Sequence, residues 1–334
     1  MQNTFKHIIS YQYDEHIIGP DITEDIILLE DHFPYYKIEN NLSREDQCAK
    51  HYGQNMLLEN CHDPHSKIWI YDSYLYSDST KNNIYIPNLT LNVQGYKNNE
   101  SPKIDRKYKF ICLNNKPRFH RVLSSVWINK NFISGEYYYT ANFNSDIPQF
   151  LEFIDFPGPG LPKRVVDLPL GDFMEINTAK FFKDTFYPHA SNSVFSIVNE
   201  VSFFEHACHL SEKTLWAILG YNIPIVSGYG MATYMERIGF DMFRDIVNYS
   251  SEFIKDPFLR TQRLLDDNLE VLKNAHDVLT PEILQRLEYN YHLQQRAEIT
   301  KHAVEKLNTP EMLAKLDEIL YNIEHMKNTY NRYR

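Results

Sequence analysis

Cysteine is scarce in this 334-residue sequence, and its scarcity excludes whole classes of protein. None of the four cysteines lies within metal-ligand spacing of another, which argues against a zinc site and against the disulfide framework of a secreted domain. The four are Cys48, Cys61, Cys112 and Cys208. We therefore expect free thiols in a reducing compartment, and so a protein of the cytoplasm.

Long hydrophobic runs are missing as well. Residues 1–10 mix polar and apolar side chains and lack the apolar stretch of a signal peptide. No later run approaches the length of a membrane span. These two absences predict a protein that has no membrane partner.

The common motifs for phosphates and metals are also absent. There is no Walker loop, and Gly228-Tyr229-Gly230 lacks the third glycine of a dinucleotide fingerprint. No Asp-X-Asp follows a predicted strand. His206 and His209 could meet a metal on a helix beside Glu205, but we expect them to be structural and predict no metal or other cofactor. The formal net charge of −10 disfavours nucleic acid as a general partner, so any anion site must be a local basic patch.

What is present is enough apolar material for two domains, since 43% of the residues are hydrophobic. Short apolar runs at 26–29 and 67–71 predict strands, and residues 45–58 resemble a helix. The polar segment 96–107 is the best linker. We divide the chain into residues 1–105, 106–260 and 261–334.

The middle part alternates strand and helix signals. Residues 109–113 form an apolar strand, and the turn 114–117 leads into an amphipathic helix whose apolar positions are 119, 122, 123, 126 and 127. Further strands are predicted at 194–198 and 223–227, and further helices at 211–219 and 231–238. This alternation is typical of an α/β fold with a parallel sheet. The aromatic run Tyr137–Tyr139 is a candidate for stacking on a sugar or a base.

The last part, from Gln262 onward, is charged and helical. Two similar start signals, Thr280-Pro281-Glu282 and Thr309-Pro310-Glu311, place Thr at a helix N-cap and Pro in the first turn. We interpret residues 261–334 as a helical C-terminal extension.

The first candidate site is the basic segment 103–121, in which Asp105 is the only acid. Arg118 and Arg121 fall in the first turns of the predicted helix, where unpaired N–H groups and the helix dipole favour an anion. Their guanidinium groups match phosphate oxygens, while Asn114 and His120 add further donors. The alternative is a solvated basic helix end.

The second candidate site is segment 198–230. Ser211 can cap a helix whose first turn holds Glu212 and Lys213. A lysine there opposes the helix dipole, unless a bound phosphate or simple exposure to water relieves it. Gly228 and Gly230 follow a predicted strand, where ligands of open α/β sheets bind.

These residues carry a resemblance. Segment 198–230 resembles the donor-binding stretch of the α1,3-fucosyltransferase group and of related phage and giant-virus glycosyltransferases, which have the GT-B fold. The matching residues are Asn199-Glu200, Ser211-Glu212-Lys213, Trp216, Gly220, Pro224 and Gly228. Residues 113–121, residues 239–243 and Arg260 also look like stretches of the viral members. The chain departs from the pattern by Ser in place of Thr at 211 and by a longer gap between Glu200 and Glu212.

The resemblance implies two Rossmann-like domains, with acceptor binding in residues 1–105 and donor binding in residues 106–260. It implies that Lys213 and Arg118 or Arg121 hold the diphosphate of a nucleotide sugar, that Glu212 holds the ribose, and that Glu200 lies near the donor sugar or base. The expected donor-binding residues are Asn114, Arg118, His120, Arg121, Glu200, Ser211, Glu212, Lys213, Gly228, Tyr229 and Gly230.

The expected reaction is metal-independent transfer of a sugar from a nucleoside diphosphate sugar to a hydroxyl of a glycan or other acceptor. Arg118 and Lys213 would stabilise the leaving diphosphate. If the reaction inverts the anomeric centre, a carboxylate of the first domain would act as base, with Asp72 the first choice and Asp63 and Glu24 its rivals. The host cytoplasm is the expected location if the source is viral.

Two alternatives remain open. In the first, the acceptor is a hydroxymethylated base in DNA, as for phage DNA glycosyltransferases, and DNA binding would depend steeply on salt. In the second, the protein is a non-catalytic nucleotide-binding or assembly protein, which would bind nucleotide without turnover.

Overall fold

The computed structural model divides the chain into two compact units, one formed by residues 1–87 and 301–334 and the other by residues 88–300. It describes residues 8–11, 26–29, 68–71, 74–75, 83–85, 101–114, 119–141, 182–200, 207–208, 210–296 and 298–317. This grouping by contacts differs from the predicted division at residues 88–105 and 261–300, which lie with the second unit. The assignment of separate functional roles to residues 1–105, 106–260 and 261–334 stays a prediction.

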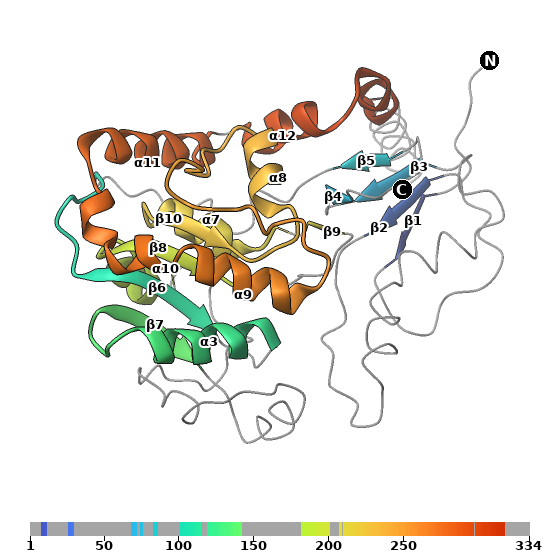
Figure 1. The fold of residues 1–334 in the computed structure, drawn as a ribbon. Coiled ribbons are helices and arrows are strands. Elements are labelled where there is room, and N and C mark those ends of the chain that lie inside the picture. Colours follow the sequence, from blue (N-terminus) through green and yellow to red (C-terminus); the bar gives the residue numbers. More distant parts are fainter. Residues whose placement is uncertain are drawn as a thin grey trace, which may run out of the picture. The chain divides into compact units, whose positions relative to one another are not determined.

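The first unit contains a four-stranded parallel sheet in the order β1-β2-β3-β5 (Figure 1). The strands are β1 (Ile8–Tyr11), β2 (Ile26–Leu29), β3 (Ile68–Tyr71) and β5 (Asn83–Tyr85), and β4 (Tyr74–Leu75) is a short strand after β3. The strands predicted at 26–29 and 67–71 are confirmed. The predicted helix at 45–58 lies outside the described residues.

The C-terminal residues contribute to this first unit. Helix α12 runs over Ile299–Leu307, and the side chain of Asn308 then binds the backbone of Tyr85 on β5. The Asn308 Oδ1 accepts the N–H of Tyr85, and its Nδ2 donates to the carbonyl of Tyr85, both at 2.8 Å. Thr309 then caps the following turn through the N–H of Met312, as its Thr-Pro-Glu signal predicts.

The second unit is built on a parallel sheet in the order β10-β8-β6-β7. The strands are β6 (Tyr108–Asn114), β7 (Tyr137–Ala141), β8 (Ser193–Val198) and β10 (Ile223–Val226), and a two-residue strand, β9 (Ala207–Cys208), follows β8 in the chain. Every residue of β8 and β10 is buried, which explains their nearly continuous apolar sequences. The predicted α/β class with a parallel sheet is therefore confirmed.

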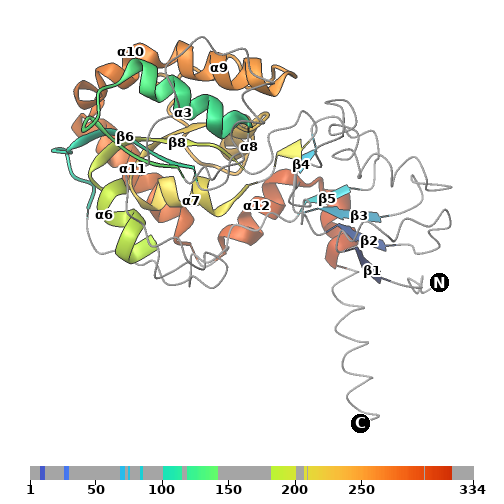
Figure 2. The same ribbon diagram turned by 90° about the horizontal axis from the view of Figure 1, so that it is seen from below.

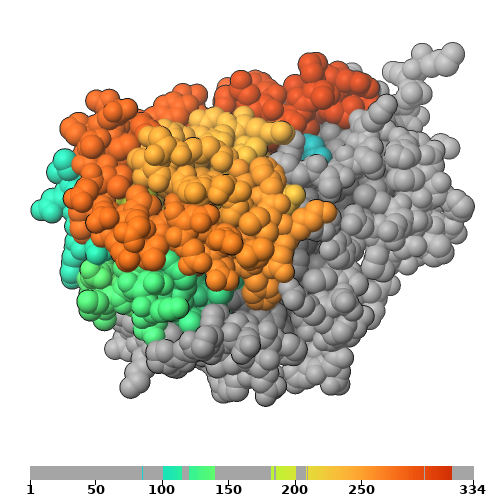
Figure 3. All heavy atoms as spheres, viewed as in Figure 1, coloured from blue at the N-terminus to red at the C-terminus, as the bar shows by residue number. Residues whose placement is uncertain are grey.

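Helices cover both faces of this second sheet (Figure 2). One face carries α3 (Phe119–Asn131), α9 (Pro257–Asp267) and α10 (Leu269–Lys273), and α3 packs on α9. The other carries α6 (Tyr187–Ala190), α7 (Glu212–Leu219) and α11 (Pro281–Gln294), and α11 packs on α7. The described residues of this unit also form the π-helix η2 (Phe182–Phe186), α8 (Met231–Arg237) and the 3₁₀ helix η3 (Ala275–Val278). In the space-filling view, described segments of residues 101–141 and of α8 to α11 form much of the visible surface of this unit (Figure 3).

The helix starts follow their sequence signals. Ser211 caps α7 by accepting the N–H of Lys213 at 3.3 Å, and Thr280 caps α11 by accepting the N–H of Ile283 at 3.3 Å. Asp256 caps α9 in the same way through Phe258 and Leu259. Local side-chain chemistry therefore decides where these helices begin.

Two predictions about this unit are wrong. Tyr137, Tyr138 and Tyr139 are not a ligand-stacking surface, because they form strand β7 and are at most 9% exposed. The predicted linker also includes residues of the second unit, because Arg106 is buried and donates to the carbonyls of Ser193 and Tyr221. The burial of both segments depends on partners far away in the chain, namely strand β6 for β7 and Ser193 and Tyr221 for Arg106.

Within the described residues, we find no helix with the length and apolar character needed to span a bilayer.

Candidate functional site

Polar side chains gather where three neighbouring strands of the second unit end. Strand β6 ends at Asn114, β8 is followed by Asn199 and Glu200, and β10 is followed by Ser227. All four are buried, with Asn114 and Glu200 fully inaccessible. Because the strands are parallel, their carboxyl ends share one edge of the sheet, which is where ligands of open α/β folds bind.

Asn199 joins the ends of these strands through its side-chain amide. Its Nδ2 donates to Oδ1 of Asn114 at 3.0 Å, and its Oδ1 accepts from the hydroxyls of Ser124 at 2.9 Å and Ser227 at 3.4 Å. Ser124 lies on α3, so one amide ties β6, β8, β10 and a covering helix together. A buried amide that is satisfied on both atoms gives this edge a defined geometry.

The first turn of α3 is fixed to the end of β8 by two basic side chains. The ring Nε2 of His120 lies 2.8 Å from the carbonyl oxygen of Glu200. Arg121 donates from Nη2 to the carbonyl of Asn199 at 3.4 Å, and it is only 3% exposed. A buried guanidinium therefore stands at the carboxyl edge of the sheet.

Glu200 reaches the start of α7 from the end of β8. Its Oε1 accepts the backbone N–H of Ser211 at 3.3 Å and the hydroxyl of Thr214. With the cap from Ser211 to Lys213, several donors of the first turn are already bound by protein side chains. A carboxylate at a helix N-terminus is favoured by the helix dipole, so Glu200 occupies a position that also suits an anionic ligand.

Glu212 and Lys213, in the first turn of α7, form an ion pair at this edge of the sheet. Lys213 Nζ lies 2.5 Å from Glu212 Oε1, and the side chains are 21% and 31% exposed. Burial opposes ionisation of Glu212, but the positive charges of Lys213 and Arg121 outweigh it and lower the pKa of Glu212. Lys213 is the direct partner of this carboxylate, and Arg121 of α3 is a more distant positive charge.

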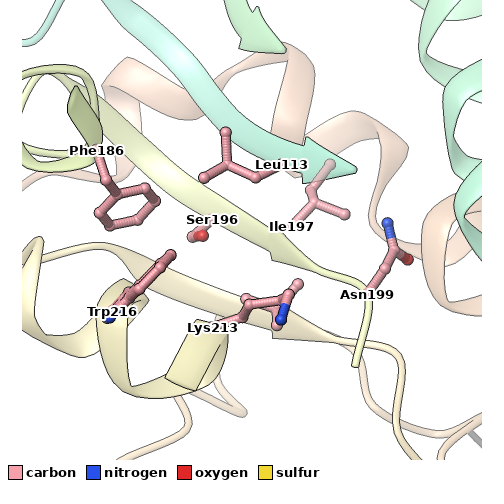
Figure 4. A pocket seen from close by; sticks show the side chains of 8 residues that line it. Leu113, Phe186, Ser196, Ile197, Asn199, Lys213 and Trp216 are labelled. Carbon is pink, nitrogen blue, oxygen red and sulfur yellow. The ribbon is translucent and has the colours of Figure 1, made fainter. Parts of the chain in front are cut away.

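A small pocket lies beside Lys213 (Figure 4). Phe186 and Trp216 form its apolar end, whereas Lys213 and the amide of Asn199 lie toward the other end. Leu113, Ser196 and Ile197 line the sheet side. The pocket therefore combines an apolar wall with a cation and an amide.

The two glycines after β10 have structural reasons of their own. A Cβ on Gly228 would come within 3.1 Å of Cβ of Met231, so this glycine lets α8 pack closely. Gly230 is the N-cap of α8 and has a φ of 61°, in the left-handed region that favours glycine. Tyr229 between them contacts Arg260 and Phe253.

Gly228, Tyr229 and Gly230 follow β10 at the carboxyl edge, and hydrogen bonds or an ion pair join seven further predicted site residues there. The seven are Asn114, His120, Arg121, Glu200, Ser211, Glu212 and Lys213. The basic segment 103–121 is not one patch, however. Arg106 lies at the amino edge of the sheet, and Lys109 pairs with Glu136 at 2.6 Å. Arg118, Asp72, Asp63, Glu24, Glu205, His206 and His209 lie outside the described residues.

Four residues of the network were not predicted: Asn199 as its centre, Ser124, Thr214 and Ser227. Asn199 and Ser227 come directly after predicted strands or end one, and this position could have identified them. Cys112 and Cys208 are buried free thiols, and burial raises the pKa of Cys112 to about 12. Across the described part of the chain, no group of three or more His, Cys, Asp or Glu could hold a metal ion.

Comparisons with family models, with curated proteins and with solved structures found no match for this chain.

Proposed function

We propose that this protein is a metal-independent glycosyltransferase of the GT-B type, which transfers a sugar from a nucleoside diphosphate sugar to a hydroxyl acceptor. The observation that carries the proposal is the placement of two cations at the carboxyl edge of a parallel sheet: Arg121 of α3 donates to the carbonyl of Asn199, and Lys213 of α7 lines the same pocket as Asn199. The resemblance of the same residues to donor-binding stretches of α1,3-fucosyltransferases supports it. So does the presence of a parallel four-stranded sheet in each of the two units, as two Rossmann-like domains require.

In this proposal Lys213 and Arg121 bind the diphosphate, together with Arg118. Their positive charge stabilises the negative charge that develops on the diphosphate as the bond to the sugar breaks. Arg121 is held by the Asn199 carbonyl and is buried, so its charge acts in a medium that screens it weakly. Lys213 is part-exposed, so exchange of Glu212 for a ligand as its partner costs little.

Binding of the donor must then open the ion pair between Glu212 and Lys213. The diphosphate replaces the Glu212 carboxylate as the partner of Lys213, which frees that carboxylate to accept hydrogen bonds from the ribose hydroxyls. Glu200 keeps the start of α7 in place during this exchange, because its carboxylate binds Ser211 and Thr214. In an inverting reaction, a carboxylate of the first unit, with Asp72 the first choice, removes the acceptor proton.

The test is calorimetric titration with UDP, GDP, CDP and ADP. The proposal predicts that one of them binds and that Lys213→Ala weakens this binding by at least about tenfold, since a charge-assisted contact to phosphate is lost. Lys109→Ala is the matched control, because Lys109 is also ion-paired with a glutamate and its side chain is 19% exposed, against 21% for Lys213. Absence of binding by all four nucleotides at millimolar concentration would refute the donor site.

A further inference from the structure

Tyr229 stands at the carboxyl edge as part of an aromatic cluster. It lies between the end of β10 and the start of α8, and its ring lies over the guanidinium of Arg260 at 5.4 Å. Phe253 meets the same ring edge to face, with centroids 5.4 Å apart and planes at 88°. This geometry is the favoured T-shaped arrangement of two aromatic rings.

The buried side chain of Arg260 joins the segment that carries Tyr229 to the segment that carries Phe253. It is 1% exposed, and its Nη1 donates to the carbonyl of Ile254 at 2.7 Å while its Nε donates to the carbonyl of Ser227 at 3.4 Å. The turn that carries Tyr229 and the segment that carries Phe253 are therefore fixed to one buried side chain.

Glu252, the neighbour of Phe253, adds a second set of restraints. Its carbonyl accepts the N–H of Gly230 at 3.1 Å, and its carboxylate accepts the backbone N–H and the hydroxyl of Thr233 at 3.0 and 2.9 Å. Arg244 donates to the same carboxylate at 2.7 Å. The aromatic cluster is consequently pre-organised, which lowers the entropy that binding would cost.

Phe253 is nevertheless 44% exposed, whereas most aromatic side chains described in this unit are buried. A rigid aromatic ring open to water, at the edge of a parallel sheet where ligands bind, offers a flat apolar contact area. Nucleobases stack on such rings whatever their identity, because each has a π-face.

We propose that Phe253, held edge to face against Tyr229, is the stacking surface for the nucleobase of the nucleotide whose phosphates Lys213 binds. This inference rests on the proposed function and extends it. The anionic end of the ligand is held by Lys213 and Arg121, and its flat uncharged end by the aromatic cluster on the neighbouring strand end. Arg260 is the positioning residue, because it orders both rings from a buried site.

The test compares pyrophosphate with the nucleoside diphosphate that binds the protein most tightly. The dissociation constant of pyrophosphate divided by that of the nucleoside diphosphate measures how much the nucleoside adds to the affinity of the phosphates. In Phe253→Ala this ratio should fall by at least about fivefold, the lower end of what one stacked base contributes, while pyrophosphate affinity stays unchanged. Phe253→Trp should restore the ratio. Tyr289→Ala is the control, because Tyr289 is an aromatic residue of α11 with a similar exposure of 48%.

Three results would overturn the inference, and they separate it from the proposed function. If the nucleotide binds through Lys213 but Phe253→Ala and Tyr229→Leu leave the ratio unchanged, the stacking surface is refuted and the phosphate site stands. If Tyr289→Ala lowers the ratio equally, the effect is not local to the cluster. If neither pyrophosphate nor any nucleotide binds the unaltered protein, the proposed function and the stacking surface fail together.

Discussion

The two edges of the β10-β8-β6-β7 sheet both hold a buried arginine, but they use it differently. At the amino edge, Arg106 is 4% exposed and donates to the backbone carbonyls of Lys103, Ser193 and Tyr221. Burial lowers the pKa of Arg106 to about 10. At the carboxyl edge, Arg121 donates to the backbone carbonyl of Asn199, and the part-exposed ion pair of Glu212 and Lys213 lies at the same edge.

This difference separates a structural charge from one that is available to a ligand. Backbone carbonyls cannot move away from Arg106 without unfolding the sheet. Side chains such as Glu212 can exchange a protein partner for a ligand at small cost, because the pair is partly solvated. The comparison therefore predicts that damage at the amino edge lowers stability alone, whereas damage at the carboxyl edge also lowers nucleotide affinity.

The largest effect on stability is expected from Arg106→Ala. The change removes three hydrogen bonds from a charged donor and leaves buried carbonyls without that partner, which we expect to destabilise the second unit by about 3 kcal/mol. Hydrogen exchange of the backbone amides of β8 measures the loss, with exposed Lys103→Ala as control. The nucleotide affinity of the folded fraction should not change. A tenfold loss of affinity would contradict a purely structural role for the amino edge.

At the carboxyl edge, Asn199→Ala should lower both properties. It removes the amide that binds Asn114, Ser124 and Ser227, so we expect a loss of about 2 kcal/mol. Because Asn199 also lines the pocket beside Lys213, nucleotide affinity should fall as well. Urea unfolding and calorimetry together test this, and Asn274→Ala, an exposed amide on Glu270, is the control. Unchanged affinity would make Asn199 purely structural.

A glycine at each edge offers a smaller and more closely matched test. Gly135 precedes β7 with a φ of 102°, and Gly230 follows β10 with a φ of 61°. Alanine at either position should cost about 1–2 kcal/mol, because L-residues disfavour positive φ. Thermal unfolding should show similar losses for the two variants, while calorimetry should show weaker nucleotide binding only for Gly230→Ala. Equal nucleotide affinity in the two variants would show that the turn between β10 and α8 is not part of the nucleotide site.

The smallest effect is expected from Glu212→Gln. The folded protein lowers the pKa of Glu212, so its ionised form contributes stability above the unfolded pKa of about 4.3, and this is lost as the pH falls through the lower folded pKa. Since the pair is partly exposed, Glu212→Gln should cost about 0.5 kcal/mol or less at pH 7. Melting curves at pH 7 and below pH 4 test this: a difference that persists or grows in acid would have the wrong sign.

Local signals in the sequence predicted much of the second unit. Apolar runs marked β6, β8 and β10, and capping residues marked the starts of α7 and α11. Strand β7 was missed. Its sequence, Tyr137–Ala141, does not alternate between apolar and polar residues, and it is placed in the sheet by pairing with the distant strand β6. Strand order was not predictable either, since it depends on contacts between residues far apart in the chain.

The candidate site was predicted in part for the same reason. Ser211, Glu212 and Lys213 lie in one helical turn, so their proximity follows from the sequence. That Arg121 lies at the carboxyl edge, while Arg106 from the same basic segment lies at the opposite edge, depends on β6 running between them. Spacing along the chain could not distinguish the two arginines. The aromatic cluster of Tyr229, Phe253 and Arg260 likewise joins three segments that only folding brings together.

Consumption of a nucleotide sugar is the most direct test of transferase activity. The protein is incubated with a panel of UDP-, GDP-, CDP- and ADP-sugars, and release of the nucleoside diphosphate is measured with water or an added sugar as acceptor. We expect that sugars of one base are consumed and that Lys213→Ala lowers the rate by at least about 100-fold, because transition-state charge stabilisation is lost. Lys109→Ala should leave the rate unchanged. Lys213-dependent nucleotide binding without consumption of any of these donors would contradict the account and make the protein a nucleotide-binding protein without transferase activity.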